Sequence, residues 1–360
     1  MAQTFQVVDL FAGSGGITTG FHLTERYRTV GAVEINLSAA TTYAENFGKD
    51  IVHCGDIGGW KPEDAATEAD VVVGGPPCQG FSNLGTKRID DARNQLWREY
   101  VRVLNQITPK VFVIENVDRF LKTEEFEALS NEAMVGGMLE NYKLRWAVVN
   151  AADYGSAQLR RRTIVIGTHR DLTPIEIPEP TVSSESWRTV RQALLGLPQH
   201  VSEDKQLLPE GTVDHHGKSV PGAFSWLTLH LTRKYESISR ERFREIPEGG
   251  NRFHLPDRLK SPCWLKHTSG SADVMGRLRW DKPSVTIRTE FFKPEKGRYL
   301  HPTEHRALTH LEAARIQGFP DDFRWCGSKV QIARQIGNAV PVELSTAIGK
   351  HVAESLDARL

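Results

Sequence analysis

Residues 70–82 read Asp70-Val71-Val72-Val73-Gly74-Gly75-Pro76-Pro77-Cys78-Gln79-Gly80-Phe81-Ser82, and this stretch decides the fold. The run of three valines predicts a buried strand of a parallel sheet. Two glycines and two prolines then exclude a helix, so a rigid loop must follow the carboxyl end of the strand. Ligands bind at that end of open α/β sheets. Cys78 in this loop is therefore a candidate nucleophile, although a small buried thiol is the plain alternative.

The composition is that of a globular protein with room for one large and one smaller domain. The chain has 360 residues, of which 39% are hydrophobic and 25% charged. No apolar run approaches the roughly 18 residues of a membrane helix, and the start of the chain lacks the features of a signal peptide. The four cysteines are too scattered for a zinc site. We therefore expect a cytoplasmic protein with no membrane contact and no metal.

The formal net charge is zero, but the charge is unevenly distributed. Residues 231–300 contain 16 lysines and arginines against 9 acidic residues. Such an excess is expected where one face of a protein meets phosphates, although a solvated surface with scattered arginines is the alternative. Replacing three of these basic residues, for example Arg252, Arg258 and Lys260, should therefore weaken DNA binding and flatten its salt dependence.

The N-terminal region predicts an adenosine site. A strand at 5–10 enters the glycine turn 13–16, which precedes a helix at 17–23, but Thr18 occupies the third glycine position of the dinucleotide fingerprint. Glu34 ends the next strand, where it could hold a ribose or instead cap the helix 37–47. Asp56 follows a third strand at 51–53. Carboxylates without a phosphate clamp fit S-adenosylmethionine better than NAD or ATP.

A second carboxylate and a basic run follow the cysteine loop. Glu115 ends the strand 110–114, so we expect it beside that loop. Strands at 143–150 and 163–168 flank the run 158–162, where period-two alternation puts Arg160 and Arg162 on one face. Helices are expected at 94–105 and 124–139. A Thr309–Glu312 capping box predicts a helix to residue 317, and the last helix is expected at 342–356.

These patterns predict an α/β fold, a doubly wound and mostly parallel sheet of Rossmann type, with a second and smaller loop-rich domain. Prolines after residue 168 mark a linker, and glycines and prolines are frequent from 181 to 300. The expected domains are 1–175 plus 306–360 for catalysis and cofactor binding, and 176–305 for the small domain.

Five segments in this order resemble the signature motifs of the cytosine-C5 DNA methyltransferases of restriction–modification systems. They are residues 9–16, Pro77-Cys78-Gln79, Glu115-Asn116-Val117, residues 158–162 and Gly337-Asn338-Ala339-Val340. The resemblance covers roughly 5–170 and 276–350. Residues 181–275 match no motif, and this is where the family places its target-recognition region.

The resemblance implies four catalytic residues. Cys78 should attack C6 of the cytosine, and Glu115 should protonate N3. Arg160 should contact O2 of the base and hold Glu115, while Arg162 should support the site or bind phosphate.

The resemblance also implies a binding site for S-adenosyl-L-methionine, with S-adenosyl-L-homocysteine as the product. Ile35 departs from the aromatic residue that some members have at that position. The residues implied at the site are Phe11, Gly13, Gly15, Glu34, Ile35, Asp56, Ile57, Pro77, Leu96, Asn338 and Val340.

The function that follows is a DNA (cytosine-5)-methyltransferase that acts on a flipped-out cytosine of double-stranded DNA through a covalent Cys78 adduct. We expect a monomer on DNA, associated with the nucleoid, alongside a cognate restriction endonuclease. A tRNA cytosine-C5 methyltransferase on the same fold would carry the same motifs, so the substrate must discriminate. A DNA-binding relative without activity would be expected to lack Cys78 or Glu115. Thr18 opposes a nicotinamide dehydrogenase.

Overall fold

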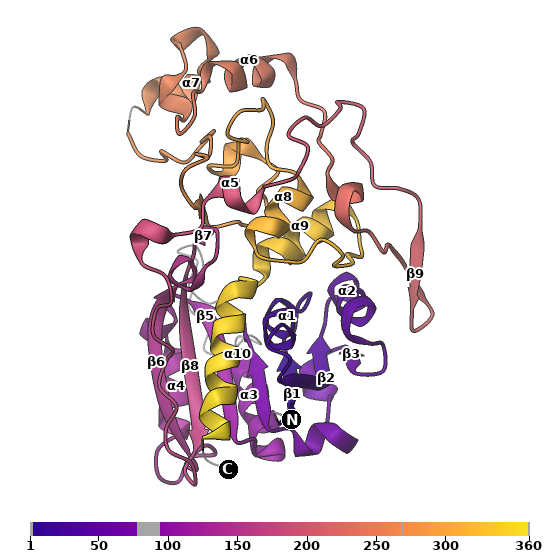
Figure 1. The fold of residues 1–360 in the computed structure, drawn as a ribbon, viewed down its shortest axis with the longest axis vertical. Helices are drawn as coiled ribbons and strands as arrows, with labels where there is room; N and C mark the ends of the chain where they lie inside the picture. The colour runs from indigo at the N-terminus through magenta and orange to yellow at the C-terminus, as the bar shows by residue number, and fades with distance from the viewer. Residues whose placement is uncertain (1–2, 78–93, 268, 359–360) are drawn as a thin grey trace. The chain divides into compact units, whose positions relative to one another are not determined.

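A seven-stranded sheet forms the centre of the N-terminal part of the chain (Figure 1). The computed structural model describes residues 3–77, 94–267 and 269–358. The strand order is β3-β2-β1-β4-β5-β8-β6, and β8 alone runs antiparallel to its neighbours β5 and β6. The strands are β1 Phe5–Leu10, β2 Tyr27–Glu34, β3 Val52–Cys54, β4 Val71–Gly74, β5 Val111–Val117, β6 Tyr142–Asn150 and β8 Arg161–His169. The predicted mostly parallel α/β sheet is confirmed.

Helices accompany the sheet, and most begin and end close to the predicted residues. They are α1 Gly16–His22, α2 Leu37–Phe47, α3 Asn94–Ile107, α4 Glu124–Glu132 and α10 Val342–Asp357. The helix predicted to reach residue 139 is an exception. It ends at Glu132 because Gly136 has a left-handed backbone with φ of 88°, and the Leu139 amide donates to the Glu132 carbonyl at 2.8 Å, which closes a turn.

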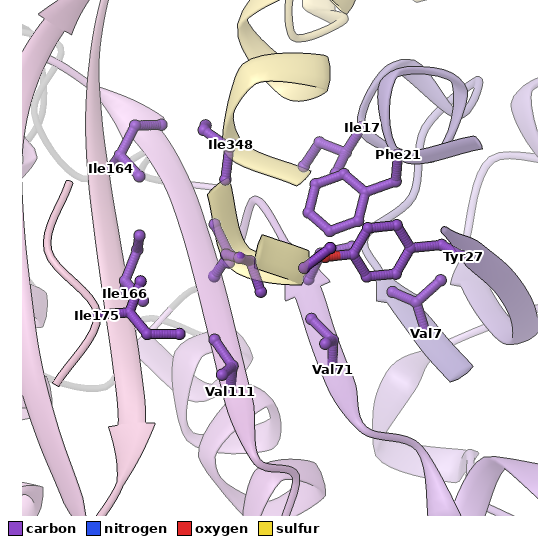
Figure 2. Close-up of a cluster of buried hydrophobic side chains, with 14 of the residues drawn as sticks. Val7, Ile17, Phe21, Tyr27, Val71, Val111, Ile164, Ile166, Ile175 and Ile348 are labelled. Carbon is purple, nitrogen blue, oxygen red and sulfur yellow. The ribbon is translucent and has the colours of Figure 1, made fainter. Parts of the chain in front are cut away.

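Alternate residues of the central strands bury opposite faces of the sheet. Val7 and Val71 belong to a hydrophobic cluster with Phe21 of α1 and Ile348 of α10 (Figure 2). Their neighbours in sequence, such as Val8, belong to the cluster on the other face, to which α3 contributes. This burial on both faces is why the strands are runs of apolar residues. It also leaves the carboxyl edge of the parallel strands as the place where polar side chains gather.

The backbone contacts divide the chain into two structural units. Unit 1 comprises Met1–Tyr154, Arg161–Thr181 and Val340–Leu360, and unit 2 comprises Gly155–Arg160 and Val182–Ala339. This division groups 306–339 with unit 2, whereas the sequence analysis expected that segment in the catalytic domain. Within the described residues, none of the helices combines the length and the apolar character needed to cross a membrane.

Unit 2 has little regular structure, as its glycines and prolines predicted. Its strands and α-helices are β7 Gln158–Leu159, α5 Val190–Ala193, β9 Thr212–His215, β10 Lys218–Pro221, α6 Ser237–Glu245, α7 Pro262–Lys266, β11 Ser284–Val285, α8 His310–Ile316 and α9 Lys329–Asn338. The predicted capping box is present: the Thr309 hydroxyl accepts from the Glu312 amide, and the Glu312 carboxylate accepts from the Thr309 amide.

Candidate active site at the carboxyl edge of the sheet

The glycine turn after β1 is tied to the end of β2 by one carboxylate. Glu34 accepts from the Gly13 amide at 2.8 Å and from the Asn36 amide at 2.7 Å. Burial raises the pKa of Glu34. Asn36, and not Glu34, caps α2 by accepting from the Ala39 amide. Glu34 is therefore held at the turn, which is the arrangement a ribose-binding carboxylate needs.

Thr18, the residue that breaks the dinucleotide fingerprint, has its own function in the structure. Its hydroxyl donates to Asp9 at 2.6 Å and lies 2.7 Å from the Tyr43 hydroxyl. All three side chains are buried, and burial raises the pKa of Asp9 to about 7, against the lowering effect of the Thr18 hydrogen bond. This network was not predicted from the sequence, although an aspartate inside an apolar strand is the signal that could have revealed it.

Apolar residues expected around an adenine come together in unit 1. Phe11 and Leu96 pack against the cluster that contains buried Ile57. Ile35 follows Glu34 and has 69% of its surface exposed. Asp56 is exposed, and its carboxylate accepts from the Gly58 amide at 2.7 Å. An exposed apolar side chain beside two oriented carboxylates fits an adenosine.

The remaining residues of the expected cofactor site are more scattered. Pro77 is exposed after β4, and Gly15 has a left-handed backbone with φ of 90° at the start of α1. A Cβ on Gly15 would lie 2.3 Å from the Phe47 ring, so only glycine fits there. Val340 is buried in unit 1, whereas Asn338 is exposed at the end of α9 in unit 2.

The predicted acid, Glu115, is held by an arginine of the neighbouring strand. Arg162 Nε lies 2.6 Å from Glu115 Oε1, and the two side chains are 15% and 12% exposed. A Cβ on Gly75 would lie 3.3 Å from Glu115 Oε2, so the backbone after β4 passes close to this carboxylate. Glu115 therefore lies beside the start of the Pro-Pro-Cys loop, as predicted. Cys78 itself lies outside the described residues.

Two further residues fix this edge, and the sequence analysis gave neither of them a role. The Asn116 side chain donates to the Pro76 carbonyl at 2.8 Å, which joins the end of β5 to the loop that leads to Cys78. The Thr163 hydroxyl donates to the Val117 carbonyl at 3.0 Å. Asn116 directly follows Glu115 in the sequence, and Thr163 directly follows Arg162. This adjacency to predicted catalytic residues is the signal that could have identified them.

The two arginines expected on one face are placed differently from the prediction. Arg162, rather than Arg160, holds Glu115. Arg160 is only 2% exposed and donates to the backbone carbonyls of Ile287 at 2.8 Å and Gly337 at 3.1 Å, all within unit 2. The physical reason is that β8 begins at Arg161, so the alternation assumed for the whole run does not extend back to Arg160.

The basic excess of residues 231–300 is partly structural. Arg252, expected to contact phosphate, is 4% exposed and donates to the carbonyls of His267 and Gly270. Arg258 pairs with Glu241 and Glu245, and Lys260 pairs with Asp257. The choice of Arg252 as a phosphate contact was therefore wrong, whereas Arg258 and Lys260 form surface ion pairs, which leave their phosphate contacts a prediction. Counting charges does not distinguish a cation that faces solvent from one that binds protein oxygens.

Comparison with known proteins gives one family. A family model described as C-5 cytosine-specific DNA methylase matches residues 5–354. The Type II methyltransferase M1.HphI of Haemophilus parahaemolyticus is 33% identical over 363 residues, which is 96% of this chain and 86% of that protein. The Type II methyltransferase M.PspPI of Psychrobacter sp. (strain TA137) is 34% identical over 364 residues, 99% of this chain and 81% of that protein.

Solved structures agree in fold. A protein described as a DNA modification methyltransferase encoded within an E. coli prophage has a TM-score of 0.72 at 25% identity, over 98% of this chain and all of that one. The Dnmt2 methyltransferase of S. pombe has a TM-score of 0.67 at 18% identity, over 99% of both chains. At that identity, the second likeness concerns the fold alone.

Proposed function

The chain belongs to the C-5 cytosine-specific DNA methylase family and is an enzyme that methylates cytosine in DNA, and from this premise we propose its mechanism. A methyl group from S-adenosyl-L-methionine is transferred to C5 of a cytosine that is flipped out of a specific duplex sequence, through a covalent adduct with Cys78. The observation that carries the proposal is the Glu115–Arg162 pair beside the start of the Pro-Pro-Cys loop.

Cys78 is the proposed nucleophile because C5 of cytosine does not react by itself. The thiolate adds to C6, which becomes tetrahedral, and the former C5–C6 π electrons move to the C4–C5 bond while N3 takes a proton. The product is an enamine whose C5 is nucleophilic. After C5 is methylated, a base removes the C5 proton and the C6–sulfur bond breaks, which releases the thiolate. The Asn116 hydrogen bond to Pro76 supports this assignment because it ties the chain two residues before Cys78 to the strand that carries Glu115.

Glu115 is the proposed acid for N3 of the cytosine. Protonation of N3 accepts the electrons that the thiolate pushes into the ring, so the acid must lie against the Watson–Crick edge of the base. The 2.6 Å contact from Arg162 Nε to Glu115 Oε1 orients the carboxyl group for this transfer. We assign Arg162 this positioning role and assign Arg160 to the internal bracing of unit 2.

The residues for the methyl donor are drawn mainly from unit 1. Glu34 would hold the ribose, Phe11 and Ile35 would contact the adenine, and Asp56 would accept from its amino group. When bound, S-adenosyl-L-methionine supplies an electrophilic methyl group on a sulfonium. The hydrogen bonds of Glu34 to the Gly13 and Asn36 amides support this assignment because they fix the carboxylate before the ligand arrives.

The target cytosine must leave the duplex, because stacking covers the ring face from which Cys78 reaches C6 and base pairing covers the Watson–Crick edge where Glu115 reaches N3. Flipping costs a few kcal/mol, which contacts to the flanking DNA offset. We assign those contacts to the target-recognition domain, expected at 176–305. The Type II methyltransferases among its relatives support a partner restriction endonuclease, and we expect the enzyme to act as a monomer.

Bisulfite sequencing of DNA from cells that express the wild-type protein tests the function. We expect protection of one cytosine within a fixed sequence, and none in cells that express Cys78→Ser. The purified protein is offered duplex DNA and tRNA with labelled methyl donor in parallel. Methyl transfer to tRNA alone would overturn the DNA assignment, and near-normal DNA methylation by the Ser variant would overturn the nucleophile.

A further inference from the structure

Arg279 is a basic residue of the segment 231–300 whose guanidinium group is available to a ligand. It is exposed, and it has no hydrogen-bond or ion-pair partner among the residues that the structure describes. By contrast, Arg252 and Arg277 are buried and donate to backbone carbonyls, and Arg258 pairs with two glutamates. A guanidinium without a protein partner retains all five donors for a ligand.

The backbone beneath Arg279 is firmly held. Segments 277–280 and 248–250 lie side by side: the Arg277 amide donates to the Gly250 carbonyl at 3.0 Å, and the Trp280 amide donates to Glu248 Oε1 at 2.7 Å. Leu278 and Trp280 are buried on either side of Arg279. Arg279 itself is exposed between these two buried residues.

Two arginines, buried Arg277 and partly buried Arg298, brace this pair of segments. Arg298 donates through Nη1 to the carbonyls of Gly249, Gly250 and Arg277, each at 2.9 Å. Arg277 donates in turn to the carbonyls of Ile246 at 2.7 Å and His301 at 2.6 Å. Hydrogen bonds from charged donors are among the stronger ones, so the platform that carries Arg279 should change little when a ligand binds.

Gly249 has no side chain, and the Arg279 guanidinium group lies in the space that a side chain would fill. The Gly249 backbone is left-handed, with φ of 73°, and a Cβ at this position would lie 2.4 Å from Arg279 Cζ and Nε. The guanidinium therefore lies directly over the glycine, where any other residue would displace it. The missing Cβ of Gly249 therefore leaves room for the guanidinium close to the backbone.

We propose that Arg279 reads a guanine of the recognition sequence through the N7 and O6 atoms in the major groove. The planar fork of an arginine matches these two acceptors, and this pairing is the commonest specific contact between protein side chains and DNA bases. The guanidinium lies over Gly249 with donors that no described residue occupies, on a backbone that Arg277 and Arg298 brace, so it can present two parallel donors to a base edge. The inference rests on the proposed function, because it takes duplex DNA as the ligand.

The test compares sequence selection by the wild-type chain, Arg279→Ala and Arg279→Lys. Each protein selects bound duplexes from a pool with randomised positions, and methylated positions are then mapped by bisulfite sequencing. At one position of the selected sequence, we expect the preference for guanine over the other bases to be about 5- to 150-fold smaller for Arg279→Ala than for the wild type. Preferences at the other positions should stay the same. Arg279→Lys should retain part of the preference for guanine. Arg258→Ala is the matched control, since Arg258 is exposed but paired with acids.

A salt titration of DNA affinity separates base reading from phosphate binding. If Arg279 bound only a phosphate, the alanine variant would bind every sequence more weakly and its salt slope would fall by about 0.9. That result, or unchanged selection by Arg279→Ala, would overturn the inference. If the wild-type chain selects a sequence but does not methylate its cytosine, the proposed function is contradicted. The selection data would then still show whether Arg279 reads a guanine.

Discussion

Arg160 and Arg162 are two residues apart in one basic run, yet their guanidinium groups have different partners. Arg162 pairs with the Glu115 carboxylate, whereas Arg160 binds the backbone carbonyls of Ile287 and Gly337. The first arrangement orients a reacting group. The second holds together segments of unit 2 that are far apart in sequence.

Lysine substitutions should separate these two roles. Arg162→Lys keeps the charge but loses the Nε donor, so we expect the single-turnover methylation rate to fall by about 10²-fold with little change in stability. Arg160→Lys leaves buried carbonyls without donors and should lower the free energy of unfolding by about 1–3 kcal/mol. Urea unfolding and single-turnover assays on both variants check this. The reverse pattern would exchange the two assignments.

Asp9 should make stability depend on pH. Burial raises its pKa to about 7 in the folded protein, whereas an aspartate in the unfolded chain has its ordinary pKa near 4. The neutral carboxyl group therefore favours the folded state at low pH, and this contribution is lost as the pH rises through about 7. Thr18, Tyr43 and Glu34 are the groups that act on Asp9.

The Asp9→Asn variant removes this titration while keeping an oxygen for the Thr18 hydroxyl. We expect its melting temperature to fall less than that of the wild type between pH 5 and pH 8. Thermal melts across this range provide the measurement. Equal slopes for the two proteins would mean that Asp9 is already ionised in the folded state.

Some residues could be identified from the sequence and others could not. Glu34 and Glu115 follow apolar strands, so topology alone brings them to the carboxyl edge. Arg160 and Arg252 resemble solvent-facing cations in sequence, and only the folded backbone reveals the carbonyls that they bind. The partner of a long side chain depends on contacts between segments, which local periodicity does not encode.

At the level of elements, the N-terminus of α8 was predicted from the sequence, but the ion pair that Glu312 forms there was not. The capping box at Thr309 and Glu312 is a local pattern, and the structure confirms it. Glu312 also accepts from both terminal nitrogens of buried Arg306, at 2.8 and 2.7 Å. Burial raises the pKa of Glu312, but the charge and hydrogen bonds of Arg306, with smaller contributions from His301 and His230, together outweigh it and lower the pKa to about 2.

Glu312→Gln should be strongly destabilising. Arg306 would keep its buried charge without a compensating carboxylate, which typically costs about 3–5 kcal/mol. Urea unfolding of the variant, compared with the surface variant Arg258→Ala, provides the measurement. A loss below about 1 kcal/mol would show that solvent reaches Arg306 in the folded protein.

The C-terminal end of helix α4 could not be predicted from apolar periodicity. Apolar periodicity continues past Glu132, but the glycines at 136 and 137 allow a left-handed turn that the pattern does not register. By contrast, α2 was predicted from Leu37 to Phe47 and is observed there. A cap and a terminal glycine bound that helix on both sides, so local sequence determines it fully.

At the level of the whole molecule, the methyl donor and the recognition sequence should be handled by different parts of the chain. Glu34 lies in unit 1 and Arg279 in unit 2. Glu34→Gln removes the negative charge of the side chain that accepts hydrogen bonds from the Gly13 and Asn36 amides. We therefore expect S-adenosyl-L-methionine to bind about 10- to 100-fold more weakly to this variant. Calorimetry should find normal donor binding in Arg279→Ala. Equal losses of donor affinity in both variants would contradict the division.

The covalent adduct at Cys78 is the central claim, and 5-fluorocytosine tests it most directly. Fluorine at C5 cannot be removed as a proton is, so the adduct persists after methyl transfer. Duplexes with this base at the target position are incubated with S-adenosyl-L-methionine and run on a denaturing gel. We predict a complex of one protein chain with the duplex strand for the wild type, and none for Cys78→Ser. A wild-type protein that methylates ordinary cytosine at this position but forms no complex would contradict the account.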